Sequence, residues 1–249
     1  MVGMKTVSRL FLALVALGWT HAAVAQSADE IVEKYLTAVG GRAALSKLTS
    51  RTMTGTITLS TPQGDLSGPV EIYSAVPNKS RTVVKLDLSA FGAGQMTVDQ
   101  RFDGTSGYVI DTLQGNREIT GGQLENMKNN AFPSPLLNYK DRGATVELAG
   151  KEKVGERDAY VLVLKGASGP TARLLIDSQT YLPARTIVKL ELPQVGEVEQ
   201  TTEFSDYRDV DGIKIPFAVR ANSSVQSSRI VITKVEHNAK IDDALFSKP

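Results

Sequence analysis

The chain has 249 residues, with 28 basic and 27 acidic side chains for a formal net charge of +1, and it contains no cysteine. This near-neutral balance provides no strong field to attract nucleic acid or an anionic membrane, so we expect no nucleic-acid partner. The lack of cysteine excludes thiol catalysis, zinc–thiolate sites and iron–sulfur clusters, and it leaves stability to the hydrophobic core.

The N-terminus has the three parts of a cleavable export signal. Lys5 and Arg9 precede an apolar run over residues 10–17, and Ala23 and Ala25 place small residues at the expected cut. A membrane anchor would need about 20 apolar residues, far more than this run contains. We therefore predict that residues 1–25 are removed as a signal peptide and that the protein is periplasmic or secreted.

A helix is predicted at the start of the mature chain. Ser27 and Glu30 have capping-box spacing, and Gly40 and Gly41 end the segment. The apolar residues between these signals fall at helical spacing and form one stripe, namely Ile31, Val32, Tyr35, Leu36 and Val39. A second short helix is expected over residues 43–48.

From Arg51 onward the apolar period changes to two. Met53, Ile57 and Leu59 alternate with threonines, which is typical of a half-buried strand. Similar alternation, punctuated by turn residues, recurs toward the C-terminus and indicates about ten to eleven strands. The sequence therefore predicts a mainly β (α+β) protein, with an antiparallel barrel or sandwich over residues 26–249 as one domain.

Residues 121–138 interrupt the β pattern. Leu124, Met127 and Ala131 fall at helical spacing, and an apolar loop bounded by Pro133 and Pro135 follows. Two interpretations remain open for this segment. It is either a helical lid that caps one mouth of a barrel or a crossover that packs on the sheet.

The search for catalytic and metal-binding residues finds little. His237 is the one histidine that follows the signal peptide. A lone histidine cannot form a histidine metal cluster, and a Ser-His-acid triad would depend on it entirely, so we interpret it as an ordinary edge residue. No acid stands out for paired-carboxylate chemistry, although distant acids can converge. We predict no catalytic residue, no metal and no cofactor, and we do not expect an enzyme.

Three stretches of the mature chain carry a family resemblance. They are residues 31–45 with the threonine-rich strand that follows, residues 174–185 (LLIDSQTYLPAR) and residues 204–217 (FSDYRDVDGIKIPF). With these stretches the chain resembles the outer-membrane lipoprotein-sorting family, the LolA/LolB-like periplasmic carriers. The matching motifs are structural turns, and they name no ligand.

The resemblance implies a fold and a function. The fold would be an incomplete antiparallel β-barrel with helices over its opening, forming a single LolA-like domain around an apolar cavity. The function would be that of a monomeric periplasmic binding or carrier protein for lipid, lipoprotein acyl chains or another hydrophobic ligand, with a membrane-protein donor or acceptor. Two alternatives stay open: a non-catalytic cell-envelope interaction module with a filled barrel, or a hydrolase with converging carboxylates.

Twelve residues are predicted to face the cavity and bind the ligand. They lie on the apolar face of the early strands or in the predicted lid, and they are Ile57, Leu59, Ile72, Val84, Leu86, Met96, Val98, Leu124, Met127, Phe132, Leu136 and Leu137. The alternative for each is that it fills a dry core. A cavity above about 300 Å³ with aliphatic walls would favour the carrier, whereas buried acids would favour the hydrolase.

Overall fold

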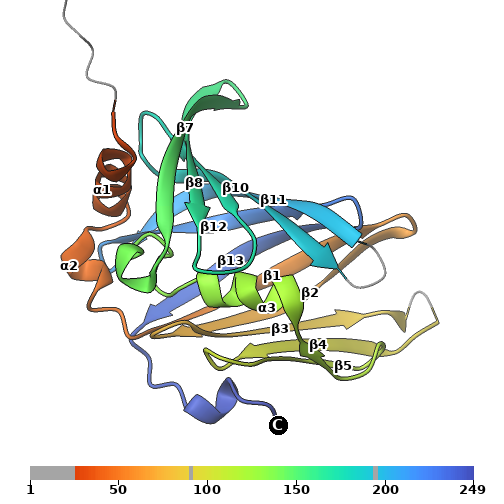
Figure 1. The fold of residues 1–249 in the computed structure, drawn as a ribbon. Helices are drawn as coiled ribbons and strands as arrows, with labels where there is room; N and C mark the ends of the chain where they lie inside the picture. Colours follow the sequence, from red (N-terminus) through yellow and green to blue (C-terminus); the bar gives the residue numbers. More distant parts are fainter. Residues whose placement is uncertain (1–25, 90–91, 193–195) are drawn as a thin grey trace, which may run out of the picture.

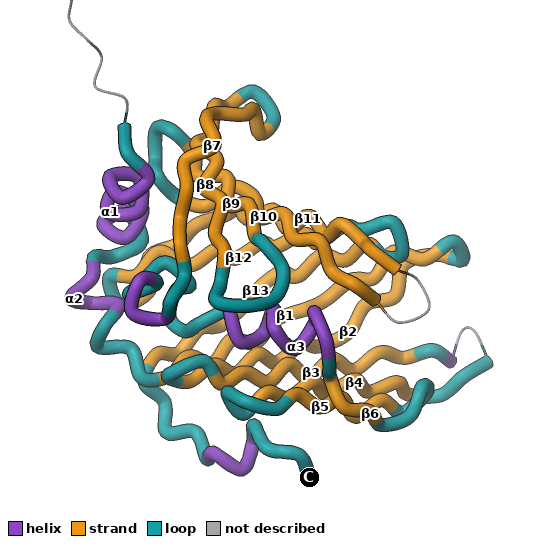
Figure 2. Tube along the Cα trace, in the orientation of Figure 1, coloured by secondary structure: helices purple, strands orange, loops and turns teal. Residues whose placement is uncertain are grey.

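The computed structural model describes residues 26–89, 92–192 and 196–249, so the predicted signal peptide lies outside the described residues. Within them the chain forms one antiparallel sheet of thirteen strands with a few short helices (Figure 1). Figure 2 shows that this sheet is strongly curved and that its two outermost strands do not meet. The predicted mainly β fold with an incomplete barrel is therefore confirmed.

The sheet has two arms that follow the chain order. The strands of the first arm are β1 (Ser50–Thr61), β2 (Gly64–Ala75), β3 (Lys79–Asp87), β4 (Gln95–Phe102), β5 (Gly107–Asp111) and β6 (Arg117–Ile119). The strands of the second arm are β7 (Thr145–Val154), β8 (Arg157–Lys165), β9 (Ala172–Asp177), β10 (Pro183–Leu192), β11 (Gly196–Val210), β12 (Ile213–Asn222) and β13 (Ser227–His237). Successive strands pair within each arm, and β1 pairs with β13 to join the arms.

The strand number exceeds the ten to eleven predicted, and the reason lies in the first arm. The five residues of β5 and the three of β6 are too short to display a clear alternation of apolar and polar side chains. These strands form because β4 presents an unpaired edge on which they can continue the ladder. Their existence is thus decided by pairing rather than by local pattern.

Two helices precede the sheet. The first, α1 (Ala28–Ala38), begins with the predicted capping box, in which Ser27 Oγ accepts from Glu30 N at 3.2 Å and Ser27 N donates to Glu30 Oε2 at 3.2 Å. The second, α2 (Arg42–Leu45), is shorter than the predicted segment over residues 43–48. The capping prediction and the position of the first helix are confirmed.

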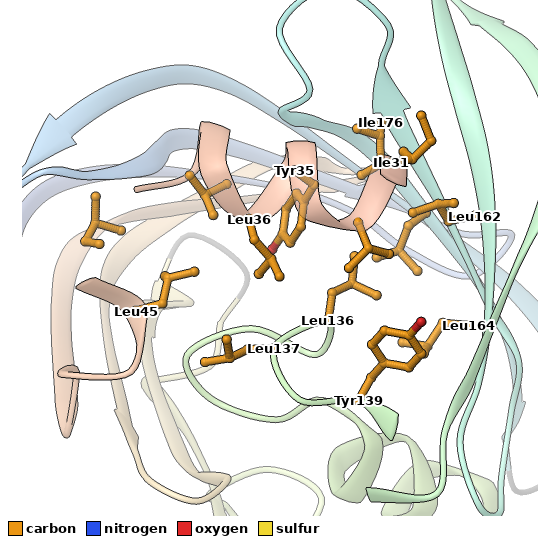
Figure 3. Packing of buried hydrophobic residues seen from close by; sticks show 14 of the residues in the cluster. Ile31, Tyr35, Leu36, Leu45, Leu136, Leu137, Tyr139, Leu162, Leu164 and Ile176 are labelled. Carbon is orange, nitrogen blue, oxygen red and sulfur yellow. The ribbon is translucent and has the colours of Figure 1, made fainter. Parts of the chain in front are cut away.

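The apolar stripe of α1 packs against the second arm and the crossover loop. Figure 3 shows Leu36 of α1, Leu136 of the loop and Leu162 of β8 in one cluster of buried side chains. Ile31 and Tyr35 from the same stripe join this cluster. Burial of side chains of this size contributes roughly 1.5–3 kcal/mol each, so the cluster holds α1 on the sheet.

The segment between β6 and β7 crosses the open side of the sheet, because those strands are its two free edges. It contains α3 (Gly121–Asn129) and a 3₁₀ helix, η2 (Lys140–Arg142). Asn129 Nδ2 donates to the carbonyl of Ser168 at 2.7 Å, and Asn78 Nδ2 donates to the carbonyl of Lys128 at 3.1 Å. α3 is therefore fastened to both arms, and the predicted helix followed by an apolar loop is confirmed.

The C-terminal segment packs against the first arm. It contains a short 3₁₀ helix, η3 (Asp243–Leu245), followed by the fully buried side chain of Phe246. Arg101 Nη1 donates to the carbonyl of Ser247 at 3.1 Å, and Lys248 pairs with Glu118 at 3.0 Å. This segment therefore covers part of the first arm close to its free edge.

The junction between the arms requires a glycine, which leads to a testable prediction. A Cβ on Gly55 would lie 2.2 Å from the backbone oxygen of Val231 and 2.9 Å from the Cα of Ile232. Because both neighbours are backbone atoms of β13, no rotamer change relieves the clash. We expect Gly55→Ala to lower the free energy of unfolding by about 2 kcal/mol in urea denaturation. Thr54→Ala, at the adjacent exposed position, should stay within about 1 kcal/mol of the parent, and equal effects would contradict the steric explanation.

Candidate functional site

A cavity of about 450 Å³ lies between the second arm of the sheet, α1, α2 and the crossover segment. Its volume falls within the range of small-molecule binding sites. Strands β8 to β12 form one wall, and α3 with the loop after it forms the opposite one. α3 and the loop after it, which cross the open side of the sheet, thus leave a hollow between themselves and the second arm.

The wall of the cavity is mostly apolar. The apolar side chains that line it are Tyr35, Val39, Leu45, Pro133, Pro135, Leu164, Pro170, Ala172, Leu174, Pro183, Val188, Phe204, Tyr207, Ile213, Ile215 and Pro216. Polar groups come from α3 and its end (Asn126, Asn129, Asn130) and from Ser134, Thr186, Gln200 and Thr202. Among the described residues, the charged side chains that line the cavity are those of Arg51 and Lys214, and none is an aspartate or glutamate.

A buried hydrogen bond ties the crossover loop to α1 at this cavity. The hydroxyls of Tyr35 and Ser134 lie 2.8 Å apart, and Ser134 Oγ also accepts from Leu136 N at 3.2 Å. Burial raises the pKa of Tyr35, so its phenol stays neutral. The bond therefore positions the loop against α1 without placing a negative charge in the wall.

Tyr207, a second tyrosine of the cavity wall, is also held by a hydrogen bond from its hydroxyl. The hydroxyl of Tyr207 donates to the carbonyl of Pro183 at 2.8 Å, which links β11 to the start of β10. Burial is the main cause of the raised pKa of Tyr207. Both tyrosines of the cavity wall are thus neutral at physiological pH.

The two cations of the wall differ in their surroundings. Lys214 Nζ lies 3.5 Å from Asp209 Oδ2, and its side chain is partly exposed. Within the described part of the chain Arg51 has no ion-pair partner, and its buried Nε has no hydrogen-bond acceptor. Burial lowers the pKa of Arg51 to about 10, so the guanidinium still carries its charge at neutral pH.

Arg51 is not among the residues predicted to bind the ligand, although its position carries a signal. Arg51 lies two residues before Met53 in β1, on the same face as Ile57 and Leu59. A charged residue at the apolar parity of a strand is unusual, because buried charges are costly unless paired. That mismatch could have marked Arg51 as a candidate before the fold was known.

The structure places the twelve predicted ligand-binding residues elsewhere. None of them is among the residues that line the 450 Å³ cavity. Seven lie on the first arm, in or beside a separate cluster around Val70: Ile57, Leu59, Ile72, Val84, Leu86, Met96 and Val98. The other five belong to α3 and the loop behind the cavity wall: Leu124, Met127, Phe132, Leu136 and Leu137. Their role in ligand binding stays a prediction.

His237 is not an edge residue, which corrects the interpretation from the sequence. It ends β13, and β13 lies inside the sheet between β1 and β12. Its side chain is only 3% exposed, and its Nδ1 lies 3.2 Å from Asp211 Oδ2. Among the described residues no group of three or more His, Cys, Asp or Glu side chains is arranged to hold a metal ion.

A second hollow, of about 540 Å³, involves the arginine-bearing face of strands β10 to β13. Its charged lining includes Arg185, Glu203, Arg220 and Arg229. Arg185 pairs with Glu203 at 2.5 Å. This charged hollow suits an apolar ligand less well than the cavity beneath α3.

A curved, open antiparallel sheet whose helices cover an apolar cavity defines a known class of fold, and solved structures of that class resemble this chain. A LolA superfamily protein from Nitrosomonas europaea matches with a TM-score of 0.56 at 14% identity, over 90% of this chain and 99% of that one. A domain named for outer-membrane lipoprotein sorting, from Vibrio parahaemolyticus, matches with a TM-score of 0.56 at 12% identity, over 87% and 94%. The protein therefore has the LolA-like fold.

Other comparisons add detail. A DUF1329 family protein from Desulfovibrio piger matches with a TM-score of 0.57 at 15% identity, over 88% of this chain and 97% of that one. A family model described as "Uncharacterized protein" matches residues 137–249, which include the second arm of the sheet. The search of curated proteins found no match. Across the described ranges no helix is both long and apolar enough to span a membrane.

Proposed function

We propose that this protein binds and carries a lipid-like hydrophobic ligand in the cavity beneath α3. The observation that carries the proposal is the 450 Å³ hollow with a mostly apolar wall, lying between the second arm and the elements that cross the open sheet. The ligand would be a lipid, a lipoprotein acyl chain or another molecule with a hydrocarbon tail. The predicted signal peptide would deliver the carrier, as a monomer of one domain, to the periplasm.

The energetics of tail burial support reversible carriage. Each buried methylene is worth about 0.8 kcal/mol, so about ten of them contribute roughly 8 kcal/mol. Lost translational freedom and ordering of the crossover subtract several kcal/mol. About ten methylenes therefore leave an affinity nearer millimolar, and about five more buried methylenes would bring it near micromolar. Binding in this range lets a carrier both load its cargo and release it to a membrane-protein acceptor.

The composition of the wall favours a carrier over the two alternatives. A hydrolase with converging carboxylates would need acids at the ligand, and the lining residues of this cavity include none. An interaction module with a filled barrel would leave no hollow of this size behind α3. Similarity of fold to a domain named for lipoprotein sorting agrees with a ligand that has an acyl chain.

Filling the cavity tests the proposal. Val188 of β10 lines the hollow, whereas the next residue, Lys189, is exposed and pairs with Glu197 at 2.9 Å. Val188→Trp should place an indole where the tail lies and reduce affinity for a long-chain ligand at least about tenfold. The measurement is displacement of the neutral fluorophore N-phenylnaphthylamine by dodecanol or dodecanoate.

Lys189→Trp is the matched control, because it adds the same side chain to the same strand facing solvent. It should leave the affinity unchanged. Equal affinity in Val188→Trp and the parent would remove this cavity as the binding site. Mass spectrometry of the protein purified gently from its native host provides an independent check, and a preparation free of any lipid would count against the carrier.

A further inference from the structure

Arg51 presents a charge that has no ion-pair partner among the described residues. Its Nε is buried without an acceptor, and the part of its side chain that remains accessible lines the 450 Å³ cavity. The other cation of the wall, Lys214, already has Asp209 as its partner. The interior of the cavity therefore carries an uncompensated positive charge at Arg51.

A buried charge without a partner is costly. Buried ions in proteins are paired or hydrogen-bonded, because an isolated one loses its hydration without compensation. Burial is the main cause of the lowered pKa of Arg51, and among the described residues the charge effect that opposes it comes from Tyr35. Since Tyr35 is itself neutral, it leaves the guanidinium charge in place.

The neighbours of Arg51 do not supply the missing acceptor. The Phe132 ring centroid lies 5.3 Å from Arg51 Cζ, within the range of a cation–π contact, but that contact leaves the N–H donors unused. The Tyr35 hydroxyl is already paired with Ser134. The part of the cavity lining that the structure describes offers no carboxylate.

A second unpartnered nitrogen lies beside Arg51. His237 is directly opposite Arg51 in the ladder between β1 and β13, so their Cβ atoms are about 5 Å apart. The Nε2 of His237 is buried and has no hydrogen-bond partner within the described residues. Arg51 and His237 are thus neighbours on one face of the sheet, and of the two Arg51 lines the cavity.

We propose that the ligand of this cavity is an amphiphile with one compact oxyanion head, which binds the Arg51 guanidinium while its hydrocarbon tail lies along the apolar wall. This inference rests on the proposed carrier function and names the chemical class of its ligand. A carboxylate or phosphate head matches the planar guanidinium, which donates two parallel N–H···O hydrogen bonds. The tail contributes most of the affinity, and the head distinguishes this ligand from uncharged molecules with the same tail.

The test compares ligands of one length that differ in charge. Dodecanoate and dodecyl phosphate carry the oxyanion, and dodecanol does not. We expect the parent protein to bind both anions about tenfold to hundredfold more tightly than dodecanol, measured by displacement of N-phenylnaphthylamine. Acetate and inorganic phosphate, which have the charge without a tail, should not displace the fluorophore.

Arg51→Met then removes the charge but keeps an unbranched side chain of similar length. It should bring the preference for dodecanoate over dodecanol close to one while leaving dodecanol affinity intact. It should also leave urea stability equal to or above that of the parent, because no partner is stranded. Arg229→Met, which removes an exposed arginine, is the control and should keep the full preference. Arg51→Lys should keep part of it.

Each outcome has a distinct meaning. Equal binding of dodecanoate and dodecanol by the parent would overturn the oxyanion head and leave the carrier function standing. Binding of none of the tailed ligands would overturn the carrier function itself. A preference that survives in Arg51→Met, or displacement by inorganic phosphate alone, would also refute the assignment of an amphiphile head to Arg51.

Discussion

Replacing Asp99 with alanine is expected to lower the free energy of unfolding by about 4 kcal/mol. Asp99 lies in β4 and is buried between two arginines. Arg81 donates from Nε and Nη2 at 2.8 and 2.7 Å, and Arg101 donates from Nε and Nη2 at 3.1 and 2.8 Å. Removal of the carboxylate would leave two poorly solvated guanidinium groups facing each other.

The same carboxylate should make stability depend on pH. Burial by itself would raise the pKa of Asp99, but the hydrogen bonds from Arg81 and Arg101 outweigh it and hold this pKa below its usual value. A carboxylate with a lower pKa in the folded state stabilises the protein above the unfolded pKa of about 4, and this contribution is lost as the pH falls further. The parent should therefore lose stability below about pH 4 more steeply than Asp99→Asn does.

Urea denaturation at several pH values measures both effects. Asp65→Ala is the control, because Asp65 is an exposed aspartate on β2 of the same arm. It should change the free energy of unfolding by less than about 0.5 kcal/mol. Parallel pH profiles for the parent and Asp99→Asn would mean that the arginine pair does not depress this pKa.

The second large effect is expected at Leu36. This side chain of α1 is 0% exposed and lies in the cluster that also contains Leu136 and Leu162 (Figure 3). Leu36→Ala should lower the free energy of unfolding by about 3 kcal/mol, from lost burial and from the void that remains. Because Tyr35 and Val39 of the same helix line the cavity, ligand affinity should weaken as well.

Leu113→Ala provides the matched control for Leu36→Ala. Leu113 is 54% exposed, so the same truncation there should cost less than about 0.5 kcal/mol. Both variants would be compared by urea denaturation and by displacement of the neutral fluorophore. Similar losses in the two variants would mean that α1 is not held by its apolar stripe.

The charge cluster around Asp99 and the cavity lie in different parts of the sheet. Asp99 and its arginines tie together strands of the first arm. The cavity lies against the second arm, where β8 to β12 form its wall. Variants at Asp99, away from the cavity, can therefore test folding with little direct effect on the ligand, and variants such as Val188→Trp can test the ligand separately.

Several elements of this protein were determined by the sequence alone, because their signals are local. The capping pair Ser27 and Glu30 defines the start of α1. The alternation around Ile57 predicts β1, and the spacing of Leu124 and Met127 predicts α3. Helical and strand periods need only neighbouring residues, so these predictions did not depend on the rest of the fold.

The position of the cavity was decided by the tertiary structure. Alternation places apolar side chains on one face of both arms, so Leu86 and Ile215 look alike in the sequence. Only the packing of the crossover loop separates them, because it leaves a hollow beside Ile215, whereas Leu86 lies in a separate cluster. Whether two apolar surfaces touch depends on sheet curvature and on contacts between distant residues, and no local pattern encodes that.

Arg51 illustrates the same division. Its place on the apolar face of β1 can be read from the spacing to Met53. Its lack of a partner can be known only once the sheet and the crossover have brought Tyr35, Phe132 and His237 around it. The residue type and its strand face are local properties, whereas the missing counter-charge is a property of the assembled interior, since partners for a buried charge come from anywhere along the chain.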